Sequence, residues 1–274
     1  MEKSIPVIIL RGGGDLASGV ALRLHRTGIK VVITELLQPL VVRRLVAFAS
    51  AVYEGEISVE GIAAALVSDM DEAIRAFDSD QIPLFVDPDC DVRHAAGLDV
   101  RAIVDARMIK KAPELGMDSA PLMIGLGPGF VAGENCHVVI ETNRGHFLGR
   151  AIWEGAPQPN TGVPGSVASH SAKRVLRAPI DGVLRTLKEL GIRVKHGDAI
   201  AEVGGQPILA PFDGILRGLV HDGLAVHKGM KVGDVDPRDD PSYARLVSEK
   251  SLAIAGGVLE ALLTRPEMRQ TLWN

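Results

Sequence analysis

The stretch IPVIILRGGGDLASGVALRLHRTGIKVVITE (residues 5–35) predicts a βαβ unit at the start of the chain. Residues 5–10 form a continuous apolar run, which is typical of a strand buried on both faces. A glycine turn follows, and residues 16–27 then carry apolar side chains at helical spacing. A second apolar run, 30–34, ends at Glu35. We expect the crossover between the two strands to be right-handed.

The glycine turn fits the GxGxxA form of the dinucleotide-binding fingerprint. Gly12 permits a tight turn, Gly14 lets the backbone approach a pyrophosphate, and Ala17 allows close contact between helix and strand. Glu35 lies 23 residues beyond Gly12, about where an acid binds a ribose diol. The residues predicted to bind a cofactor are Arg11, Gly12, Gly13, Gly14, Asp15 and Glu35.

Asp15 argues against a bound phosphate at this turn. Its carboxylate follows the glycines directly, where it would repel an anion and could itself cap the helix. Arg11 is the cation that could offset this charge. Two interpretations therefore stay open: a site for a nucleotide or another phosphate-bearing ligand, and a purely structural turn.

The rest of the first half alternates between helical and strand-like segments, which favours a doubly wound, Rossmann-like domain. In such a sheet, ligands bind at the carboxyl ends of the strands. Asp87 and Asp105 both fall at such strand ends, and Asp105 is a ligand candidate. The segments expected to be helices are 39–49, 58–66 and 70–77, and those expected to be strands are 51–55, 83–87 and 100–107.

The segment DPDCDVRH (87–94) invites a metal interpretation, but it lacks the glycine and the distal Glu of a calcium loop. A strand that ends in an Asp-capped helix explains the segment more simply. Cys90 and Cys136 are far apart in the sequence, which argues against a thiolate cluster and fits a reducing compartment. We therefore predict no metal.

Four polar residues lie within six positions at the end of the strand-like run 137–141, and they form the second group of ligand candidates. A hairpin with a solvated tip is one interpretation. The other is a loop that faces a substrate, with a guanidinium that binds an anion and an imidazole that acts as acid or base. These residues are Glu141, Asn143, Arg144 and His146. Asn160, in the turn-rich stretch that follows, is a further candidate.

An internal duplication dominates the second half. Residues 178–203 align without gaps to residues 210–235, and 11 of 26 positions are identical. Each copy contains a PxDG turn and strand-like segments, and the pair resembles the two halves of biotinyl and lipoyl domains. The hairpin between the halves, GGQPIL (204–209), lacks the lysine that such carriers modify. We therefore expect no biotin or lipoate.

These observations define the predicted fold class and domains. The class is α/β, with an N-terminal Rossmann-like domain and a C-terminal all-β biotinyl/lipoyl-like barrel-sandwich hybrid that contains an internal two-fold repeat. Residues 250–264 have helical periodicity. The predicted domains are the Rossmann-like domain 1–156, a linker 157–173, the barrel 174–238 and a helical tail 239–274.

Composition excludes several classes of function. The net charge of -4 and the pI near 6.1 argue against general affinity for nucleic acids. The N-terminus has no room for a secretory apolar core, and the longest uncharged run, 119–133, is too short and too rich in Gly and Pro to span a bilayer. We therefore expect a cytoplasmic protein that binds neither nucleic acid nor membrane.

Several motifs occur in order across nearly the whole chain: RGGGDLASGVALRL, VDARMIKK (104–111), IGLGPGFVAG (124–133), ETNRGHFLGR (141–150), NTGVPG (160–165) and the repeat. Together they resemble one family, the YqeB-type accessory proteins of the selenium-dependent molybdenum hydroxylase system. The resemblance implies a bacterial maturation factor whose partners are a nucleotide-like small molecule and a molybdenum hydroxylase or another maturation protein. It implies a dinucleotide or a molybdopterin nucleotide as cofactor, and it supplies no catalytic residue.

Two other functions remain as alternatives. An NAD(P)-dependent oxidoreductase would need a proton donor near the nicotinamide ring, but the chain has no Tyr-x-x-x-Lys pair, and its tyrosines are Tyr53 and Tyr243. A non-catalytic scaffold or docking protein would bind a partner protein and no small molecule tightly. Asp15 favours the scaffold over the oxidoreductase.

Overall fold

The structure, a computed structural model, describes residues 4–159 and 174–273. The chain divides into two compact units. Unit 1 consists of Met1–Pro39, Phe48–Asn160 and Val247–Asn274, and unit 2 consists of Leu40–Ala47 and Thr161–Leu246. The C-terminal segment therefore belongs to the same unit as the glycine turn.

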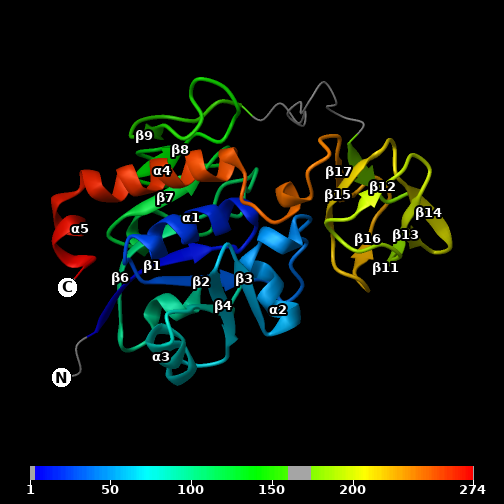
Figure 1. Ribbon diagram of the computed structural model, residues 1–274. Coiled ribbons are helices and arrows are strands. Elements are labelled where there is room, and N and C mark those ends of the chain that lie inside the picture. The colour runs from blue at the N-terminus through cyan, green and yellow to red at the C-terminus, as the bar shows by residue number, and fades with distance from the viewer. Residues whose placement is uncertain (1–3, 160–173, 274) are drawn as a thin grey trace. The chain divides into compact units, whose positions relative to one another are not determined.

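Unit 1 is built on a nine-stranded mixed sheet with the order β3-β4-β5-β2-β1-β6-β7-β8-β9 (Figure 1). The strands from β4 to β8 in this order run parallel, and the edge strands β3 and β9 are antiparallel to their neighbours. The strands are β1 (Ile5–Arg11), β2 (Val31–Glu35), β3 (Glu56–Val59), β4 (Ile62–Val67), β5 (Ile82–Val86), β6 (Leu98–Asp105), β7 (Met123–Leu126), β8 (Val138–Ile140) and β9 (Ala151–Ile152).

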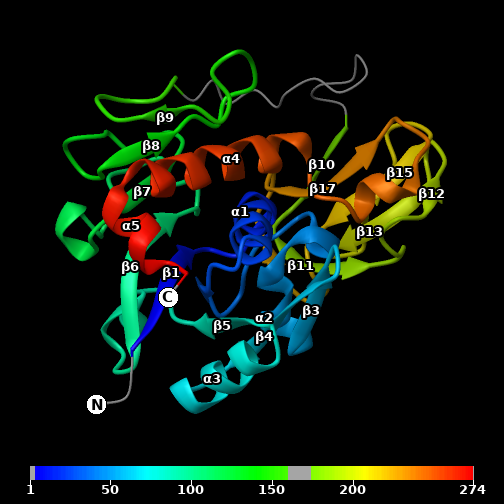
Figure 2. The ribbon, with the colours of Figure 1, turned by 60° about the vertical axis from the view of Figure 1, so that its left-hand side comes forward.

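The helices of unit 1 cover the two faces of this sheet unequally. Helices α1 (Asp15–Arg26) and α4 (Glu249–Thr264) lie side by side on one face, as Figures 1 and 2 show. The other face packs against α3 (Met70–Asp78) in a core that includes Ile9 and Phe130. Shorter elements complete the unit: α2 (Ala51–Glu54), α5 (Pro266–Thr271) and the 3-10 turns η2 (Phe48–Ser50), η3 (Asp91–His94) and η4 (Met117–Ser119).

The order of the strands places a topological switch point between β1 and β6. After β1 the chain adds β2, β3, β4 and β5 on one side of it, and then crosses to add β6 on the other. Arg11 is the register partner of Asp105 at this point, and Thr34 is its partner on β2. In open α/β sheets, ligands bind outside the carboxyl ends of the strands at such a point. The last residues of β1, β2 and β6 therefore define the region of interest.

Several local predictions are confirmed: the strand–helix–strand unit of residues 5–35, the helix at 70–77, the strands at 83–87 and 100–107, and the helix at 250–264. Three others are wrong. The expected helix 58–66 is a β-hairpin, since Glu60 and Gly61 both adopt positive φ (47° and 85°) in a two-residue turn between β3 and β4. The expected helix 39–49 forms only 3-10 turns, and the expected strand 51–55 is the short helix α2.

The predicted Rossmann-like fold class is also wrong. A doubly wound domain has a helix in each crossover, but the connections β5–β6, β6–β7 and β7–β8 contain no α-helix. Pro113, Gly116 and Pro121 interrupt the second of these connections, and Gly127-Pro128-Gly129 (127–129) the third. A helix from the other end of the chain, α4, packs against β8 and β9 instead, and the sheet is mixed rather than purely parallel.

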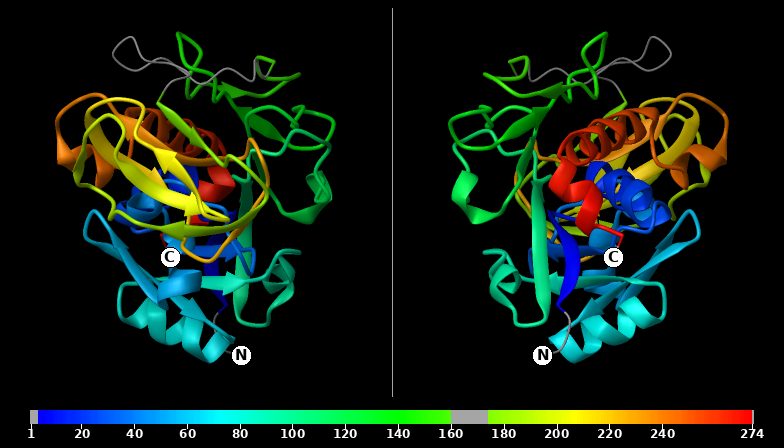
Figure 3. Two further views of the ribbon diagram at one scale, coloured as in Figure 1. Left: turned by 90° about the vertical axis from the view of Figure 1, so that its right-hand side faces the viewer. Right: turned by 90° about the vertical axis from the view of Figure 1, so that its left-hand side faces the viewer.

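Unit 2 contains two four-stranded antiparallel sheets, β10-β17-β15-β12 and β14-β13-β11-β16 (left panel of Figure 3). The duplication is visible in them, because β11, β12 and β13 recur 32 residues later as β15, β16 and β17. Each copy lends a strand to the other: Gly182 pairs with Val226, and Gly214 with Val194. The elements are β10 (Val175–Arg177), β11 (Gly182–Thr186), β12 (Arg193–Val194), β13 (Ala199–Val203), β14 (Gln206–Leu209), β15 (Gly214–Leu219), β16 (Ala225–Val226), β17 (Lys231–Asp236), η1 (Arg44–Val46) and η5 (Pro241–Ala244).

The predicted biotinyl/lipoyl-like barrel-sandwich hybrid is wrong as the class of this unit. The repeat does not form the unit alone, because β10 adds a strand from outside it and Leu40–Ala47 comes from the first half of the chain. Gly218 explains how that segment fits: a Cβ at this position would come within 2.7 Å of Val42 Cγ1. Because Gly218 has no side chain, Val42 can pack directly against the backbone of β15.

Candidate functional site

The glycine turn connects the end of β1 to the start of α1. Gly12 has φ of 98°, a conformation that favours glycine, and its amide donates a hydrogen bond to Thr34 O at 2.7 Å. Gly13 needs to be glycine for a different reason, since a Cβ there would lie 2.8 Å from the backbone nitrogen of Ala49. Gly14 is the N-cap of α1, and Asp15 is its first residue. The turn is therefore built from close backbone contacts inside the protein.

Glu35 is fixed to this turn by two backbone hydrogen bonds. Its Oε2 accepts from Gly13 N at 2.7 Å, and its Oε1 accepts from Leu36 N at 2.7 Å. Burial raises the pKa of Glu35, while the Gly13 and Leu36 amides and the charge of Arg107 act in the opposite direction. The structure thus brings the predicted acid and the predicted glycine turn together.

A network of charged side chains lies at the switch point, at the carboxyl ends of β1 and β6. Arg107 forms a bidentate ion pair with the fully buried Asp105: its Nε donates to Oδ1 at 3.0 Å, and its Nη2 donates to Oδ2 at 2.6 Å. Glu114 Oε2 accepts from Arg107 Nη2 at 2.8 Å and from Arg11 Nη1 at 3.1 Å. The hydrogen bond from Arg107 lowers the pKa of Glu114 to about 2. Sequence analysis identified Arg11 and Asp105 but missed Arg107 and Glu114.

Arg11 is committed to this network and is only 3% exposed. Its Nη1 lies 3.6 Å from Asp105 Oδ2, and its Nη2 donates to the carbonyl oxygen of Pro88 at 2.9 Å. An arginine held in this way cannot turn toward a ligand without breaking buried ion pairs. The cation that the sequence offered to offset Asp15 is therefore occupied inside the protein.

The second group of candidates follows β8. Glu141 is 1% exposed and accepts from the backbone nitrogens of Asn143 and Gln158, each at 2.7 Å, so its carboxylate shapes the loop. Asn143 also donates to the Gln158 side chain at 3.0 Å. Arg144 forms an ion pair with Glu249, the first residue of α4, and His146 is exposed. Asn160 lies outside the described residues.

The charge of Lys250 acts on both groups of candidates, and sequence analysis missed this residue. It is the second residue of α4 and is half-buried, and its charge interacts with Asp15 of the glycine turn and with Glu141 and Arg144 of the second group. No pattern near residue 250 indicated this role, because α4 comes near these residues only through its packing on α1. A charge on the C-terminal helix therefore acts on the candidate site.

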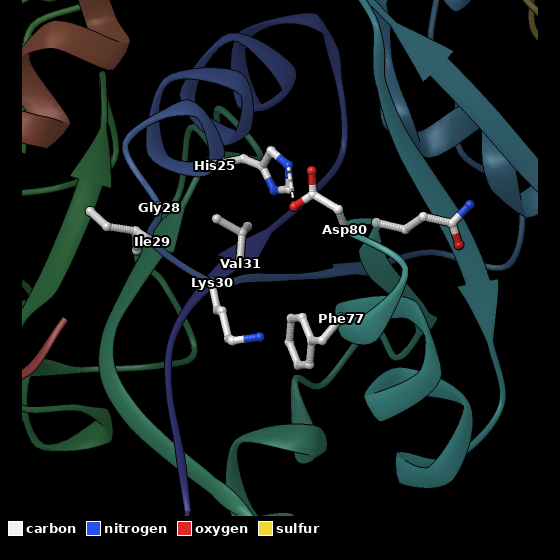
Figure 4. A pocket seen from close by; sticks show the side chains of 8 residues that line it. His25, Gly28, Ile29, Lys30, Val31, Phe77 and Asp80 are labelled. Carbon is white, nitrogen blue, oxygen red and sulfur yellow. Dashed lines mark ion pairs between the residues drawn. The ribbon is translucent and has the colours of Figure 1, made fainter. Parts of the chain in front are cut away.

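A hollow of about 120 Å³ lies at the other end of β2 (Figure 4). His25 Nε2 is 3.4 Å from Asp80 Oδ1, and Lys30 Nζ is 4.7 Å from the centroid of the Phe77 ring. The predicted ligand residues are not among those that line it. This hollow is therefore separate from the candidate site at the carboxyl edge.

The described residues, 4–159 and 174–273, carry neither a metal-binding cluster nor a membrane-spanning helix. Within these ranges, no three His, Cys, Asp or Glu side chains gather in a way that would hold a metal ion. The helices of the same ranges include none with the length and apolar character needed to cross a bilayer. Asp87, in the segment that invited a metal interpretation, instead accepts a hydrogen bond from Val92 N at 2.8 Å.

Comparison with known proteins supports the YqeB-type resemblance. The chain is 49% identical over 257 residues to the uncharacterized protein YqeB of Escherichia coli (strain K12), across 94% of this chain and 47% of that protein. The chain therefore spans about half the length of this relative. No family model matches the chain. The similarity shows a YqeB-type sequence over the matched region and names no activity.

Some solved structures are distantly similar to the chain. An aspartoacylase family protein from Mesorhizobium loti is 13% identical, with 85% of each chain covered and a TM-score of 0.28. The ectoine utilization protein EutE from Ruegeria pomeroyi is 12% identical, with 85% of this chain and 86% of that one covered and a TM-score of 0.25. A succinylglutamate desuccinylase from Silicibacter is 12% identical, with 85% and 84% covered and a TM-score of 0.25.

Proposed function

We propose that the chain binds a nucleotide or a molybdopterin-type nucleotide at the carboxyl edge of the nine-stranded sheet. We further propose that it serves as an accessory protein in the maturation of selenium-dependent molybdenum hydroxylases. The observation that carries the binding proposal is the position of Glu35, held by the Gly13 amide next to the topological switch point. The cellular role is proposed from the family that the motifs of the sequence resemble.

Glu35 has the chemistry to bind ribose hydroxyls. An ionised carboxylate offers about four lone-pair sites. The amides of Gly13 and Leu36 occupy one site on each oxygen, so each oxygen keeps a free site for a hydroxyl donor. Because the same two bonds fix the rotamer, the acceptors are oriented before a ligand arrives.

The proposed site recognises and holds a ligand, and no reaction is assigned to it. The buried Asp105 is neutralised by Arg107, and Glu141 is only 1% exposed and holds two backbone amides of its own loop, so neither carboxylate is accessible as a general base. Delivery or protection of a cofactor needs only binding. This is the activity expected of a maturation factor.

A non-catalytic docking protein is the second candidate, and the packing of the glycines favours it. Arg107 Cγ lies 3.2 Å from the Cβ position of Gly12, and Ala49 fills the space beside Gly13. Protein contacts alone therefore explain two of the glycines of the fingerprint. Under this alternative the chain would bind a partner protein and no nucleotide.

Thermal unfolding in the presence of ligands separates the two candidates. The ligands are ATP, CTP, GTP, NADH and NADPH, and the variants are wild type, Glu35→Gln and the control Glu54→Gln. Glu54 is exposed on α2, so its substitution changes the net charge equally without touching the turn. A nucleotide at 100 times its Kd should stabilise wild type and the control by about 2.7 kcal/mol. Glu35→Gln should lose most of this shift. If no nucleotide raises the unfolding temperature of wild type, the binding proposal is overturned and the docking protein is favoured.

A further inference from the structure

A hollow of about 460 Å³ opens over the carboxyl ends of β4 and β5. Small-molecule pockets usually have volumes of about 300–1,000 Å³, so this one has room for a ligand. It lies at the same edge of the sheet as the glycine turn, whereas the hollow around His25 lies at the opposite edge. The residues that line it are Leu66, Val67, Ser68, Glu72, Phe85 and Val86.

The walls of this hollow are mostly apolar. Leu66 and Val86 are 36% and 38% exposed, although they lie near the ends of neighbouring parallel strands. Val67 and Phe85, beside them in sequence, are buried in the core of the sheet. Adjacent exposed aliphatic side chains commonly mark a binding groove. The hollow is therefore suited to the apolar part of a ligand.

A fixed carboxylate lines the same hollow. Glu72 Oε2 accepts hydrogen bonds from Ser68 N at 2.8 Å and from Ser68 Oγ at 2.9 Å. Its other oxygen, Oε1, lies 3.8 Å from Arg75 Nη2 and accepts no hydrogen bond from the described residues, 4–159 and 174–273. An oriented acceptor next to an apolar wall suits a planar ring with N–H donors on its rim. Nucleobases that carry an amino group are rings of this kind.

The strand register places the hollow beside Glu35. Val86 is the register partner of Glu35. Leu66 is the partner of Leu84, two residues before Val86. Because side chains alternate along a strand, Glu35, Val86 and Leu66 project from the same face of the sheet. Neighbouring strands are about 5 Å apart, so the apolar wall begins one strand spacing from Glu35.

The other side of Glu35 is filled by charged side chains. There, β1 and β6 end in the ion pairs of Arg11, Asp105 and Arg107. A nucleotide carries its base on the carbon next to the one that bears the 2′ hydroxyl. A ribose bound at Glu35 therefore places its base within about one strand spacing, and the hollow over β4 and β5 lies within that reach.

We propose that the base of the nucleotide occupies the hollow over β4 and β5, with its ring against Leu66 and Val86 and its polar rim toward Glu72. This inference rests on the proposed function, because it takes the position of the ribose from Glu35. It adds the part of the site that distinguishes a nucleotide from a sugar phosphate. The ligand then covers two apolar side chains that the fold leaves exposed.

The experiment is calorimetric titration of AMP, CMP, GMP and ribose 5-phosphate into wild type, Leu66→Gln and the control Leu209→Gln. Leu209 is 48% exposed on β14 in unit 2, so it receives the same change outside the hollow. At least one nucleotide should bind wild type and the control about tenfold or more tightly than ribose 5-phosphate does, because its base is buried. Leu66→Gln should lose most of this advantage and bind ribose 5-phosphate as wild type does.

The comparison of nucleotides with ribose 5-phosphate needs only wild type, so it decides the case in which Leu66→Gln folds poorly. Equal measurable affinity of wild type for all four ligands would overturn the base site and leave ribose binding at Glu35 intact. An undiminished advantage in folded Leu66→Gln would do the same. If the advantage depends on Leu66 but Glu35→Gln binds the nucleotides as wild type does, the base site stands and the proposed role of Glu35 fails. If none of the four ligands binds wild type, both are overturned.

Discussion

Gly19 of α1 and Ser251 of α4 are in direct contact, although 232 positions separate them in the sequence. The nearest atoms to a Cβ built on Gly19 are Ser251 Cβ at 2.6 Å and the Ser251 carbonyl carbon at 3.0 Å. Ser251 is itself fully buried, and its amide donates to the N-cap residue Ser248. This contact holds the first turn of α4 against α1, so the packing of the two helices depends on the absence of a side chain at residue 19.

Gly19→Ala should destabilise the protein by about 1–3 kcal/mol, because the added methyl group meets backbone atoms that cannot rotate away. The matched control is Gly256→Ala in α4, where a Cβ would meet no atom within 4 Å. That substitution should stabilise by about 0.5–1 kcal/mol, since alanine is the better helix former. Urea unfolding midpoints measure both changes. Equal stability of Gly19→Ala and wild type would contradict the close packing of α1 on α4.

Asp105→Asn should cost about 3–5 kcal/mol, because it removes the fully buried carboxylate that pairs with both Arg107 and the buried Arg11. Asp99→Asn is the control on the same strand. Asp99 pairs with Arg101 at 3.3 Å, but its side chain is 40% exposed, so the loss should stay below about 1 kcal/mol. The free energies of unfolding from urea titrations decide the comparison. Similar small losses for both variants would mean that the network at the switch point contributes little.

Glu114 should make stability depend on pH in acid. Arg107 lowers its pKa in the folded protein to about 2, from an ordinary value of 4.5. A depressed folded pKa means that ionised Glu114 stabilises the fold above about pH 4.5, and that this contribution is lost as the pH falls toward 2. The difference in Tm between wild type and Glu114→Gln should therefore be largest near pH 6 and fade by pH 2. A difference that is constant with pH would show that Glu114 is not held ionised by Arg107.

Cys90 and Cys136 should be unreactive in the native protein. Both are fully buried, and burial raises the pKa of each thiol to about 11. Because the thiolate is the reactive form, neither should react with a disulfide reagent at pH 8 until the protein unfolds. Thiol titration with and without urea checks this. Rapid labelling of Cys90 under native conditions would place it in an accessible site near the end of β5.

The sequence predicts the strand–helix–strand unit and the repeat correctly because their signals are local. Apolar periodicity and glycine turns report on neighbouring residues, and the repeat appears as identity between two segments. The β3–β4 hairpin was missed since its turn places Glu60 at positive φ, which the sequence does not signal as Asn-Gly would. The fold class was wrong because α4, far along the chain, covers part of the sheet where a doubly wound fold would have a crossover helix.

The candidate site could be predicted only where its residues belong to one local unit of the sequence. Gly13 and Glu35 belong to one local unit, and the structure joins them by a hydrogen bond. The charge of Lys250 acts on the turn from the C-terminal helix through tertiary packing, which no local pattern reports. Arg11 has the charge that a phosphate site needs, but its burial beside Asp105 depends on the register between β1 and β6.

Titration of ribonucleotides and their 2′,3′-dideoxy counterparts into wild type and Glu35→Gln tests the proposed site most directly. The pairs are ATP with ddATP, CTP with ddCTP and GTP with ddGTP, measured by calorimetry as a double-mutant cycle. For the nucleotide that binds, we expect removal of the hydroxyls to weaken binding to wild type about tenfold, or about 1.4 kcal/mol, and to leave Glu35→Gln nearly unaffected. The same loss in both proteins, or no binding to wild type, would contradict a nucleotide site at Glu35.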